Sequence, residues 1–446
     1  MSNTMHRGVL APAPAPLPPS WTPLRYHPEQ QRLLASDARF KIVAAGRGSG
    51  KTFLARRRVV AALAESSGMY FVAGPTHAQT KRVYWEKLKA LVPPEWLDGP
   101  PRETELCIRT IFGSSLYVTG LDQPARIEGD QWRGGVIDEC SDIRPDAWTR
   151  SIRPALSQYR GWCWRIGVPK RFGVGAAEHR KAYESAVAHT TPDSDGFWWP
   201  SRDILTPEEI AAAQTELGMD DFEEQYNAKW LDNTGALFSG FAAQETVRPC
   251  AYDPTAKIWV GADFNVDNMS WVLAHRGAVG LSVFDEVFAR NTNTQKTLDI
   301  LWGRYGAGHT GGWYFTGDAS SRARKTSAAV TDYVTIQNDQ RFARAGRTVH
   351  MPAANPPVKD RIAATNRLLC SAAGVRALHV DARCVKLIED LKLRCELDTN
   401  PDRGHMTDAL GYLVWDQFPL RVEGPSGQGR VIILPGPSWG GGESHR

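Results

Sequence analysis

The stretch RFKIVAAGRGSGKTFLA, residues 39–55, decides the fold of the first half of the chain. Residues 40–44 predict a short buried strand, and residues 53–64 have the apolar spacing of a helix. Between them, three glycines interrupt any regular element. Glycines in such a loop let backbone N–H groups converge on phosphate oxygens, and the helix N-terminus adds partial positive charge. The stretch therefore predicts a phosphate-binding loop.

Two side chains at the start of the helix carry the chemistry of this loop. Lys51 is expected to reach the β- and γ-phosphates of ATP, and the Thr52 hydroxyl is expected to ligate Mg²⁺. The usual pattern begins with a glycine where this chain has Ala45. The strand before the loop and the helix after it still favour phosphate binding over a simple glycine-rich turn. The predicted ATP-binding residues of the loop are Gly46, Arg47, Gly48, Ser49, Gly50, Lys51 and Thr52.

Gln30 lies upstream of the loop, in the segment HPEQQ of residues 27–31. A glutamine amide both donates and accepts hydrogen bonds, so this side chain is a candidate for holding the adenine edge of ATP. A polar surface that caps a helix is the alternative, and the sequence does not choose between the two.

A second strong signal is GGVIDECSD, residues 134–142, in which an apolar strand ends in two acids. At the carboxyl edge of a parallel sheet, Asp138 is expected to hold Mg²⁺ through water. Glu139 is expected to polarise the water that attacks the γ-phosphate, as a hydrolytic base. An acidic pair after a strand is weak evidence alone, but it is strong evidence downstream of a phosphate-binding loop.

The transition state of ATP hydrolysis gathers negative charge, so an arginine is expected nearby. Arg47 inside the loop and Arg126 upstream of the acidic pair are both candidates, and the sequence leaves the choice open. The strand that follows the acidic pair ends in Val168 and Pro169, where ring ATPases place a sensor hydroxyl. A hydroxyl-based sensor is therefore not expected in this chain.

The composition is that of an ordinary globular protein. Of 446 residues, 42% are apolar and 23% are charged, which leaves room for two or three domains. A net charge of +4 permits a nucleic-acid partner without arguing for one. Seven scattered cysteines fit a reducing cytosol and argue against a zinc site or a disulfide framework. No apolar run approaches the roughly 18 residues that a membrane span needs.

We expect two globular blocks between flexible tails. The expected boundaries are 1–24 for a proline-rich tail, 25–231 for a P-loop domain with a helical lid, 232–256 for a linker, 257–420 for a second domain and 421–446 for a Gly- and Pro-rich tail. The lid is expected at residues 207–231. The linker contains three apolar residues that are expected to pack, Leu237, Phe238 and Phe241.

In the second block, three acids lie at the ends of two predicted strands and near the start of one predicted helix. Residues 257–265 predict a strand that delivers Asp263, two further strands of a meander follow, and a later strand ends at Asp318. Asp408 lies on a helix that begins at His405. Three carboxylates in this order are what a two-metal phosphodiester site needs, with Mg²⁺ or Mn²⁺ as the cation. Structural caps are the alternative for each acid taken alone.

Weaker signals surround these acids. Asp285 and Glu286 are lesser candidates for the metal site, and His405 is either a ligand, a base or a supporting partner. A cationic segment follows Asp318 and suits contact with the phosphate backbone of DNA, with a solvated loop as the alternative. The predicted DNA-binding residues are Arg322, Arg324 and Lys325.

In combination, these motifs resemble those of the large terminase subunit of tailed bacteriophages, the motor that packages DNA into procapsids. The resemblance covers roughly residues 25–420 and implies a RecA-like P-loop ATPase with a parallel sheet. It implies that an RNase H/RuvC-like nuclease domain with a mixed sheet follows, so the fold class is α/β. The matching segments are AGRGSGKT (45–52), VIDE (136–139), VGAD (260–263), YFTGD (314–318) and HMTDALGY (405–412).

The resemblance also implies roles and partners. Asp263, Asp318 and Asp408 would be metal ligands, and Arg47 or Arg126 would be the charge-stabilising arginine. Double-stranded DNA, a portal protein, a small terminase subunit and a homo-oligomeric ring, expected to be a pentamer, would be the partners. The place of action would be the cytoplasm of a bacterial host, transiently at the portal vertex, with no membrane. The alternative is an ATP-driven DNA translocase or helicase whose second domain only binds DNA or assembly partners.

Overall fold

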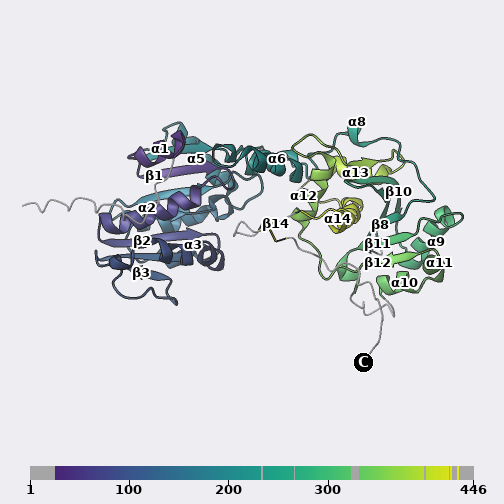
Figure 1. The fold of residues 1–446 in the computed structure, drawn as a ribbon, viewed down its shortest axis with the longest axis horizontal. Coiled ribbons are helices and arrows are strands. Elements are labelled where there is room, and N and C mark those ends of the chain that lie inside the picture. Colours follow the sequence, from purple (N-terminus) through teal and green to yellow (C-terminus); the bar gives the residue numbers. More distant parts are fainter. Residues whose placement is uncertain are drawn as a thin grey trace, which may run out of the picture. The chain divides into compact units, whose positions relative to one another are not determined.

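The computed structural model describes residues 26–232, 235–265, 267–322, 331–395, 398–420, 422–423 and 429–430. The chain divides into two compact units, each with its own sheet and its own core (Figure 1). Unit 1 comprises Met1–Ile210 and Glu223–Asp232, and unit 2 comprises Ala211–Phe222 and Asn233–Arg446. None of the helices in the described ranges has the length and apolar character needed to cross a membrane.

Unit 1 is built on a seven-stranded sheet. Every neighbouring pair of strands is parallel except the pair at one edge, β3 with β4. The expected RecA-like parallel sheet is therefore confirmed, with one antiparallel edge strand added. In spatial order the strands are β3 (Cys107–Arg109), β4 (Ser114–Gly120), β2 (Gly68–Gly74), β5 (Trp132–Ile137), β6 (Trp162–Gly167), β1 (Phe40–Ala45) and β7 (Ser194–Trp199).

The order of these strands matters for the site. β6 lies between β1, which leads into the phosphate-binding loop, and β5, which leads into the acidic pair. All three strands are parallel, so their carboxyl ends open on the same edge of the sheet. The loop and the acids therefore face each other across the end of β6.

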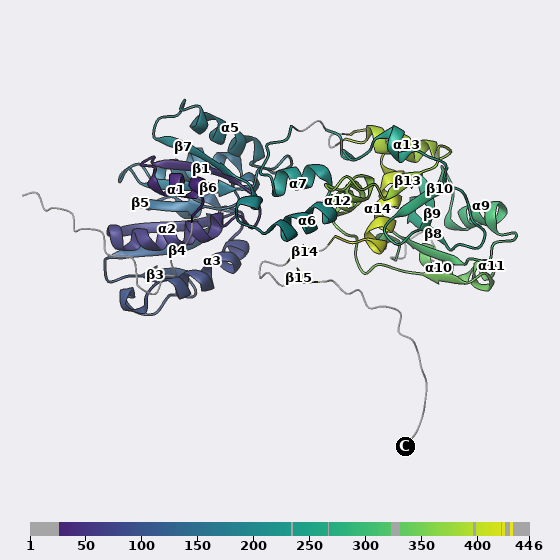
Figure 2. The same cartoon turned by 45° about the horizontal axis from the view of Figure 1, so that its top comes forward.

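The helices and turns of unit 1 cover both faces of its sheet (Figure 2). The predicted helix at 207–231 is shorter in the structure, because it is interrupted near Gly218 and ends at Gln225. The helices of unit 1 are α1 (Pro28–Ala35), α2 (Lys51–Glu65), α3 (His77–Leu91), α4 (Arg153–Ala155) and α5 (Ala176–Val187). Two further helices, α6 (Pro207–Glu216) and α7 (Met219–Gln225), are divided between the units, since Ala211–Phe222 belong to unit 2. The short turns are η1 (Pro94–Trp96), η2 (Pro124–Ile127), η3 (Cys140–Asp142), η4 (Ala147–Ile152) and η5 (Ser201–Asp203).

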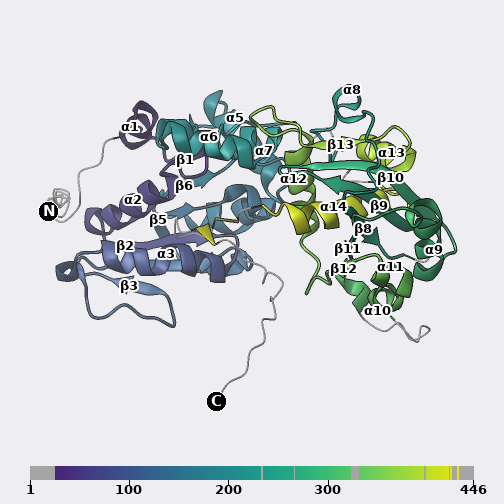
Figure 3. The ribbon, with the colours of Figure 1, turned by 45° about the vertical axis from the view of Figure 1, so that its right-hand side comes forward.

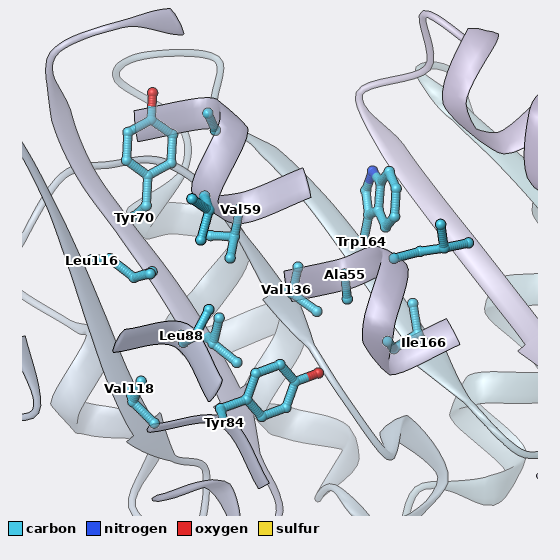
Figure 4. Close-up of a cluster of buried hydrophobic side chains, with 14 of the residues drawn as sticks. Ala55, Val59, Tyr70, Tyr84, Leu88, Leu116, Val118, Val136, Trp164 and Ile166 are labelled. Atoms are coloured by element: carbon cyan, nitrogen blue, oxygen red, sulfur yellow. The ribbon is translucent and has the colours of Figure 1, made fainter. Parts of the chain in front are cut away.

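The core of unit 1 follows from the alternation of side chains along its strands. Trp164 and Val136 pack with α2 and α3 on one face, whereas Cys163 and Ile137 pack on the other. Figure 4 shows the first of these faces, where Val59 of α2 lies among side chains from the strands. Burial on both faces explains why the strands read as continuous apolar runs in the sequence.

Unit 2 is built on a six-stranded mixed sheet. The predicted meander is confirmed, since β8, β9 and β10 are joined antiparallel. β11 then pairs parallel with β8, and β12 pairs parallel with β11, which is the strand arrangement of the RNase H fold. In spatial order the strands are β12 (Arg347–Val349), β11 (Trp313–Gly317), β8 (Ile258–Asp263), β9 (Met269–Arg276), β10 (Leu281–Ala289) and β13 (Leu378–Val380).

Helices pack on both faces of the second sheet (Figure 3). α12, α13 and α14 contribute to one apolar cluster, and α9, α10 and α11 contribute to the other. Phe238, Leu237 and Phe241, from the predicted linker, pack into the first of these clusters. The elements are α8 (Ala243–Thr246), α9 (Thr294–Tyr305), η6 (Ala319–Arg322), α10 (Asp332–Asn338), α11 (Gln340–Arg344), α12 (Val358–Leu369), α13 (Val385–Leu393), α14 (His405–Gln417), β14 (Val422–Glu423) and β15 (Gly429–Arg430).

Gly261 sets how closely α14 approaches β8. A Cβ at this position would lie 2.4 Å from the Ala409 carbonyl oxygen and 2.7 Å from the Leu413 Cβ. Both atoms belong to the fixed frame of α14, so neither can move aside without shifting the helix. Because α14 carries Asp408 and β8 ends at Asp263, the absence of a side chain at Gly261 brings these two acids toward each other.

We predict that Gly261→Ala destabilises unit 2 by roughly 2 kcal/mol, because the added methyl group overpacks the contact between β8 and α14. The matched control is Gly303→Ala. Gly303 lies within α9, and a Cβ added there would have no atom within 4 Å, so the same methyl group should be neutral or stabilising by up to about 1 kcal/mol. Calorimetric unfolding of the full chain compares the two variants. Equal effects at both positions would contradict the close-approach argument.

Candidate nucleotide-binding and carboxylate sites

The phosphate-binding loop connects β1 to α2 and is shaped by two glycines in the left-handed region. Gly48 has a φ of +68° and Gly50 has a φ of +80°, which residues with a side chain rarely adopt. α2 begins at Lys51, immediately after Gly50. Ala45, which stands where the usual pattern has a glycine, is the last residue of β1 and pairs with Trp199 of β7. A side chain is therefore accommodated there as part of the sheet.

Two buried polar groups make the loop suitable for phosphate. The Lys51 side chain is buried, and its Nζ donates a 3.3 Å hydrogen bond to the Gly46 carbonyl. The Ser49 hydroxyl is also buried and has no hydrogen-bond partner among the described residues. A buried cation and an unpaired hydroxyl are both costly unless a polar or anionic group joins them. This arrangement fits the predicted phosphate ligand.

The back of the loop is held by residues far away in the sequence. The Trp199 indole and the Gln30 amide both donate to the Ser49 carbonyl, at 2.9 and 3.3 Å. A Cβ on Gly46 would lie 2.3 Å from the Ser201 Oγ, so only glycine fits at that position. Gln30 therefore supports the loop in this structure, and its contact with adenine stays a prediction.

Asp138 follows β5 and is hydrogen-bonded to side chains from α2 and α3. The Thr52 hydroxyl donates to its Oδ2 at 3.0 Å, and the Tyr84 hydroxyl donates to the same oxygen at 2.7 Å. Burial raises the pKa of Asp138, the nearby Glu139 carboxylate raises it further, and the Lys51 charge lowers it. A hydroxyl and a carboxylate that meet beside a phosphate-binding loop are the ligand types that Mg²⁺ prefers.

Glu139 has a strained backbone, with a φ of +56°. Its N–H donates to the Asp138 Oδ1 at 2.9 Å, and its carboxylate lies 3.8 Å from the Lys170 Nζ. Lys170 also pairs with Asp142. No sequence motif singles out Lys170, although its position just after Val168 and Pro169, at the end of the strand between β1 and β5, is a usable signal. The carboxylate of the catalytic candidate Glu139 therefore lies next to the ammonium group of Lys170.

A buried hydrogen-bonded pair supports the ends of β5 and β6. The Ser141 hydroxyl donates to the Val168 carbonyl at 2.9 Å and lies 2.9 Å from the His179 Nδ1. Because the carbonyl takes the hydroxyl proton, Nδ1 must donate to Ser141. Burial lowers the pKa of His179 to about 3, and the charge of Arg165 adds to this effect. His179 is therefore neutral at pH 7 and holds the segment that follows Glu139.

We predict that His179 contributes to acid unfolding of the chain. The unfolded chain binds a proton at this residue below a pH of about 6.5, but the folded chain binds it only near pH 3, so stability falls as the pH drops through this window. His179→Asn should lower stability at pH 7 and remove up to ~4 kcal/mol of the pH dependence between pH 6.5 and 3. The control is His189→Asn, at an exposed residue just after α5. Unfolding in urea at several pH values measures both, and an unchanged slope in His179→Asn would contradict the assignment.

The two candidate arginines lie in different settings. Arg47 is exposed on the loop, and its backbone N–H donates to the Gln225 carbonyl at 2.6 Å. Arg126 lies in η2 and pairs with Asp122 at 3.7 Å, with 38% of each side chain exposed. These surroundings do not distinguish Arg47 from Arg126, so the identity of the charge-stabilising arginine stays a prediction.

In unit 2, Asp263 and Asp318 come from adjacent parallel strands. Asp263 ends β8, and Asp318 follows β11 and donates its N–H to the Ala262 carbonyl at 3.1 Å. His405 Nδ1 lies 2.9 Å from the Asp263 Oδ2, and this hydrogen bond raises the pKa of His405. Burial raises the pKa of Asp263, and the charges of Asp408 and Asp318 raise it further. The three predicted acids therefore act on one another electrostatically.

Asp408 is engaged by two arginines that no sequence motif singles out. Arg361 Nη1 donates to its Oδ1 at 2.9 Å, and Arg394 donates to both carboxylate oxygens, at 3.1 and 3.2 Å. Arg394 also donates to the Thr407 hydroxyl at 2.7 Å, and the Arg361 guanidinium lies 4.2 Å from the centre of the Tyr412 ring. Arg361 lies on α12 and Arg394 follows the end of α13, so the sequence around Asp408 does not predict these contacts.

The acids of unit 2 fit a divalent cation by their chemistry, since three carboxylates are hard oxygen ligands. In the described ranges, however, no group of three or more His, Cys, Asp or Glu side chains is arranged to hold a metal ion. Asp318 accepts a 2.5 Å hydrogen bond from Asn355, and Asp408 is held by its arginines. Metal binding by Asp263, Asp318 and Asp408 therefore stays a prediction, and it requires Asp408 to exchange an arginine for the cation.

We predict that Arg394→Leu tightens Mn²⁺ binding by about tenfold, because it removes a charge-assisted bidentate partner that competes for Asp408. The matched control is Arg304→Leu, which breaks the 2.7 Å Arg304–Asp285 pair in the same unit. Calorimetric titration with Mn²⁺ measures the affinity without requiring cleavage activity. Weaker or unchanged binding in Arg394→Leu would mean that Arg394 positions Asp408 and does not compete with the cation.

The lesser acidic candidates have structural partners. Glu286 accepts hydrogen bonds from the backbone N–H groups of Lys386 and Leu387, both at 2.8 Å, at the start of α13. Asp285 pairs with Arg304. Glu286 therefore caps a helix, which a sequence pattern cannot distinguish from a metal ligand.

The predicted DNA-binding residues fall at a gap in the described chain. Arg322 is the last residue of η6, and its side chain lies outside the described part of the structure. Arg324 and Lys325 lie outside the described residues altogether. Their contact with DNA stays a prediction.

The two units together define an α/β chain with a RecA-like unit followed by an RNase H-like unit. No protein-family model matches the sequence, and no curated protein matches it. The large terminase of a thermophilic bacteriophage is similar in fold, with a TM-score of 0.55 at 14% identity over 88% of this chain and 99% of that chain. Its complex with ADP gives the same values, and its complex with ATP-γ-S gives a TM-score of 0.54 at 14% identity over the same shares. The chain therefore shares the fold of that large terminase along nearly its whole length.

Proposed function

We propose that this protein is the large terminase subunit of a tailed bacteriophage, a motor that hydrolyses ATP to translocate double-stranded DNA into a procapsid and cuts the DNA with a metal-dependent endonuclease. One observation carries the proposal. A single chain carries a phosphate-binding loop and an acidic pair on either side of β6, and then an RNase H-like sheet. In that sheet β8 ends in Asp263 and β11 is followed directly by Asp318. The fold shared with the large terminase of the thermophilic bacteriophage supports it.

In unit 1, the proposed reaction is the attack of water on the γ-phosphate of ATP. Backbone N–H groups of the loop and Lys51 bind the phosphates. Thr52 and Asp138 would hold Mg²⁺, which would neutralise developing charge when bound. Glu139 accepts a proton from the attacking water. The Lys170 Nζ lies 3.8 Å from the Glu139 carboxylate and pairs with it beside the proposed position of the attacking water.

In unit 2, the proposed reaction is hydrolysis of a DNA phosphodiester. Asp263, Asp318 and Asp408 would hold the metal ions, and Mg²⁺ or Mn²⁺ supplies water activation and stabilisation of the leaving oxygen when bound. His405 orients the Asp263 carboxylate through the 2.9 Å hydrogen bond. Arg322, Arg324 and Lys325 are proposed to hold the DNA backbone beside these acids.

The proposal includes the partners that the resemblance to large terminase subunits implies. These are a portal protein, a small terminase subunit and further copies of this chain in a ring on the procapsid. The site of action would be the portal vertex in the cytoplasm of the host. The domain boundaries proposed for these activities are 25–231 and 257–420, with 232–256 between them.

One observation favours a second candidate function. The Arg361 and Arg394 partners of Asp408 are what a structural carboxylate would have. In that case the chain is an ATP-driven DNA translocase or helicase whose second unit only binds DNA or assembly partners. The two functions differ in whether the acids of unit 2 are needed for cutting.

Two substitutions test the proposal separately. Glu139→Gln should lower the turnover of ATP by about a hundredfold or more while ATP still binds, because only the base is lost. Asp263→Asn should abolish the nicking of plasmid DNA in Mn²⁺ and leave ATP hydrolysis intact. Phosphate release and gel assays measure these activities, with Asp299→Asn, an exposed acid of α9, as the control.

The outcomes separate the two candidate functions. Nicking that survives Asp263→Asn would favour the second candidate. Loss of DNA packaging into procapsids in Glu139→Gln would favour the packaging motor over a helicase. Full ATP turnover in Glu139→Gln would contradict the assignment of the base.

A further inference from the structure

A cavity of about 460 Å³ lies in unit 1, away from the phosphate-binding loop. It opens at the amino ends of β1 and β6, whereas the loop follows the carboxyl end of β1. Lys41 near the start of β1 is five residues from Gly46, which corresponds to roughly 17 Å at the rise of a strand. The cavity is therefore a separate site, and its volume is in the range of pockets that hold small ligands. The lining residues that bear on its chemistry are Arg39, Lys41, Arg58, Arg160, Trp162 and Asp193.

Cationic side chains outnumber acidic ones in this lining. Arg39 donates to the carbonyls of Gly161 and Leu156, both at 2.8 Å, and the Lys41 ammonium donates to the carbonyls of Leu33 and Ser36, at 2.7 and 2.6 Å. Within the described part of the chain, neither Arg39 nor Lys41 forms an ion pair with a carboxylate. Both are held in place by neutral acceptors, and the carboxylates nearest to them, Asp193 for Arg39 and Asp195 and Asp37 for Lys41, act only through space.

The other two cations are only partly neutralised. Arg58 pairs with Glu65 on the same helix at 2.8 Å, and its guanidinium lies 4.4 Å from the centre of the Trp162 ring. Arg160 lies 3.7 Å from Asp193, and 79% of its side chain is exposed. Arg160 is therefore largely exposed in the lining of the cavity, whereas Arg58 packs against the ring of Trp162.

Burial and the neighbouring positive charges disfavour the protonated forms of the two cations that line the cavity, Lys41 and Arg39. Burial lowers the pKa of Lys41 to about 8, and the charge of Arg58 contributes to the effect. Burial also lowers the pKa of Arg39, the charges of Arg153 and Arg160 lower it further, and the charge of Asp193 opposes them. Like charges gathered around a cavity destabilise one another, and an anion in the cavity would relieve that repulsion.

We propose that this cavity binds a phosphate group, carried either by free phosphate or by nucleic acid. Arginine guanidiniums suit phosphate because they present several donors in one plane. Arg58 lies on α2, and Arg160 lies in the turn that precedes β6. The indole of Trp162 forms an apolar wall beside them. The site is distinct from the proposed ATP site and does not depend on the proposed ATPase or nuclease activity.

The test is binding of inorganic phosphate to the full chain, by calorimetry, with ADP and Mg²⁺ present so that the phosphate-binding loop is filled. The informative variants are Arg160→Glu and Arg58→Gln. The matched control is Arg150→Glu, because the Arg150 side chain is also 79% exposed, is paired only loosely with an acid at 3.9 Å and lies outside the cavity. We expect phosphate affinity to fall at least fivefold in the two cavity variants and to be unchanged in the control. Thermal unfolding of each variant verifies that the fold is kept.

A second arm identifies the source of the phosphate. A short duplex with a 5′-phosphate and the same duplex with a 5′-hydroxyl are titrated in competition with inorganic phosphate. Competition by either duplex, lost in Arg160→Glu, assigns the cavity to nucleic acid; competition by neither, with phosphate binding intact, assigns it to free phosphate. No phosphate binding to the wild-type chain, or an equal loss in Arg150→Glu, would overturn the proposal.

Discussion

The hydrogen bond from Thr52 to Asp138 links the first turn of α2 to the end of β5, across the end of β6. The ATPase activity proposed for unit 1 depends on this contact, because it joins the phosphate-binding loop and the acidic pair at one edge of the sheet. The contact exists because β1, β6 and β5 are parallel, so the loop and the acidic pair that follow their carboxyl ends lie at the same edge of the sheet.

The same constraint governs unit 2. Asp263 and Asp318 stand at the ends of neighbouring parallel strands, and Gly261 lets α14 approach the sheet closely enough to add Asp408. The difference lies in how the charges are balanced. Asp138 is held by hydroxyl groups, whereas Asp408 is held by two guanidiniums. The carboxylate of unit 1 is therefore held by neutral donors, whereas Asp408 of unit 2 is already paired with two cations that would compete with a metal ion for it.

Much of the fold could be predicted from the sequence, because its signals are local. The strand before the loop, the helix after it, the strand that ends in Asp138 and the meander that follows Asp263 are all read from apolar spacing and glycine placement. The helix expected to reach residue 231 ends earlier, at Gln225. The chain then turns so that the Tyr226 carbonyl accepts from the Ser201 N–H, a tertiary contact with no local signature.

The parts that the sequence could not predict are contacts between distant residues. Lys170 reaches Glu139 because β6 lies next to β5, and Arg361 reaches Asp408 because α12 packs against α14. The cavity lined by Arg58 and Arg160 is also a product of packing, since its residues come from four separate segments of the chain. Charged residues of this kind look like ordinary surface positions until the fold brings them together.

The central claim is that one chain holds a nucleotide–metal site in unit 1 and a separate metal-dependent cutting site in unit 2. Anomalous diffraction from crystals of the chain grown with ADP, a short DNA duplex and Mn²⁺ tests it most directly. The account predicts one Mn²⁺ peak beside Thr52 and Asp138, and at least one more that is shared by Asp263, Asp318 and Asp408, with Arg394 withdrawn from Asp408. A peak in unit 1 alone, with Asp408 still bound by Arg361 and Arg394, would contradict the claim for unit 2.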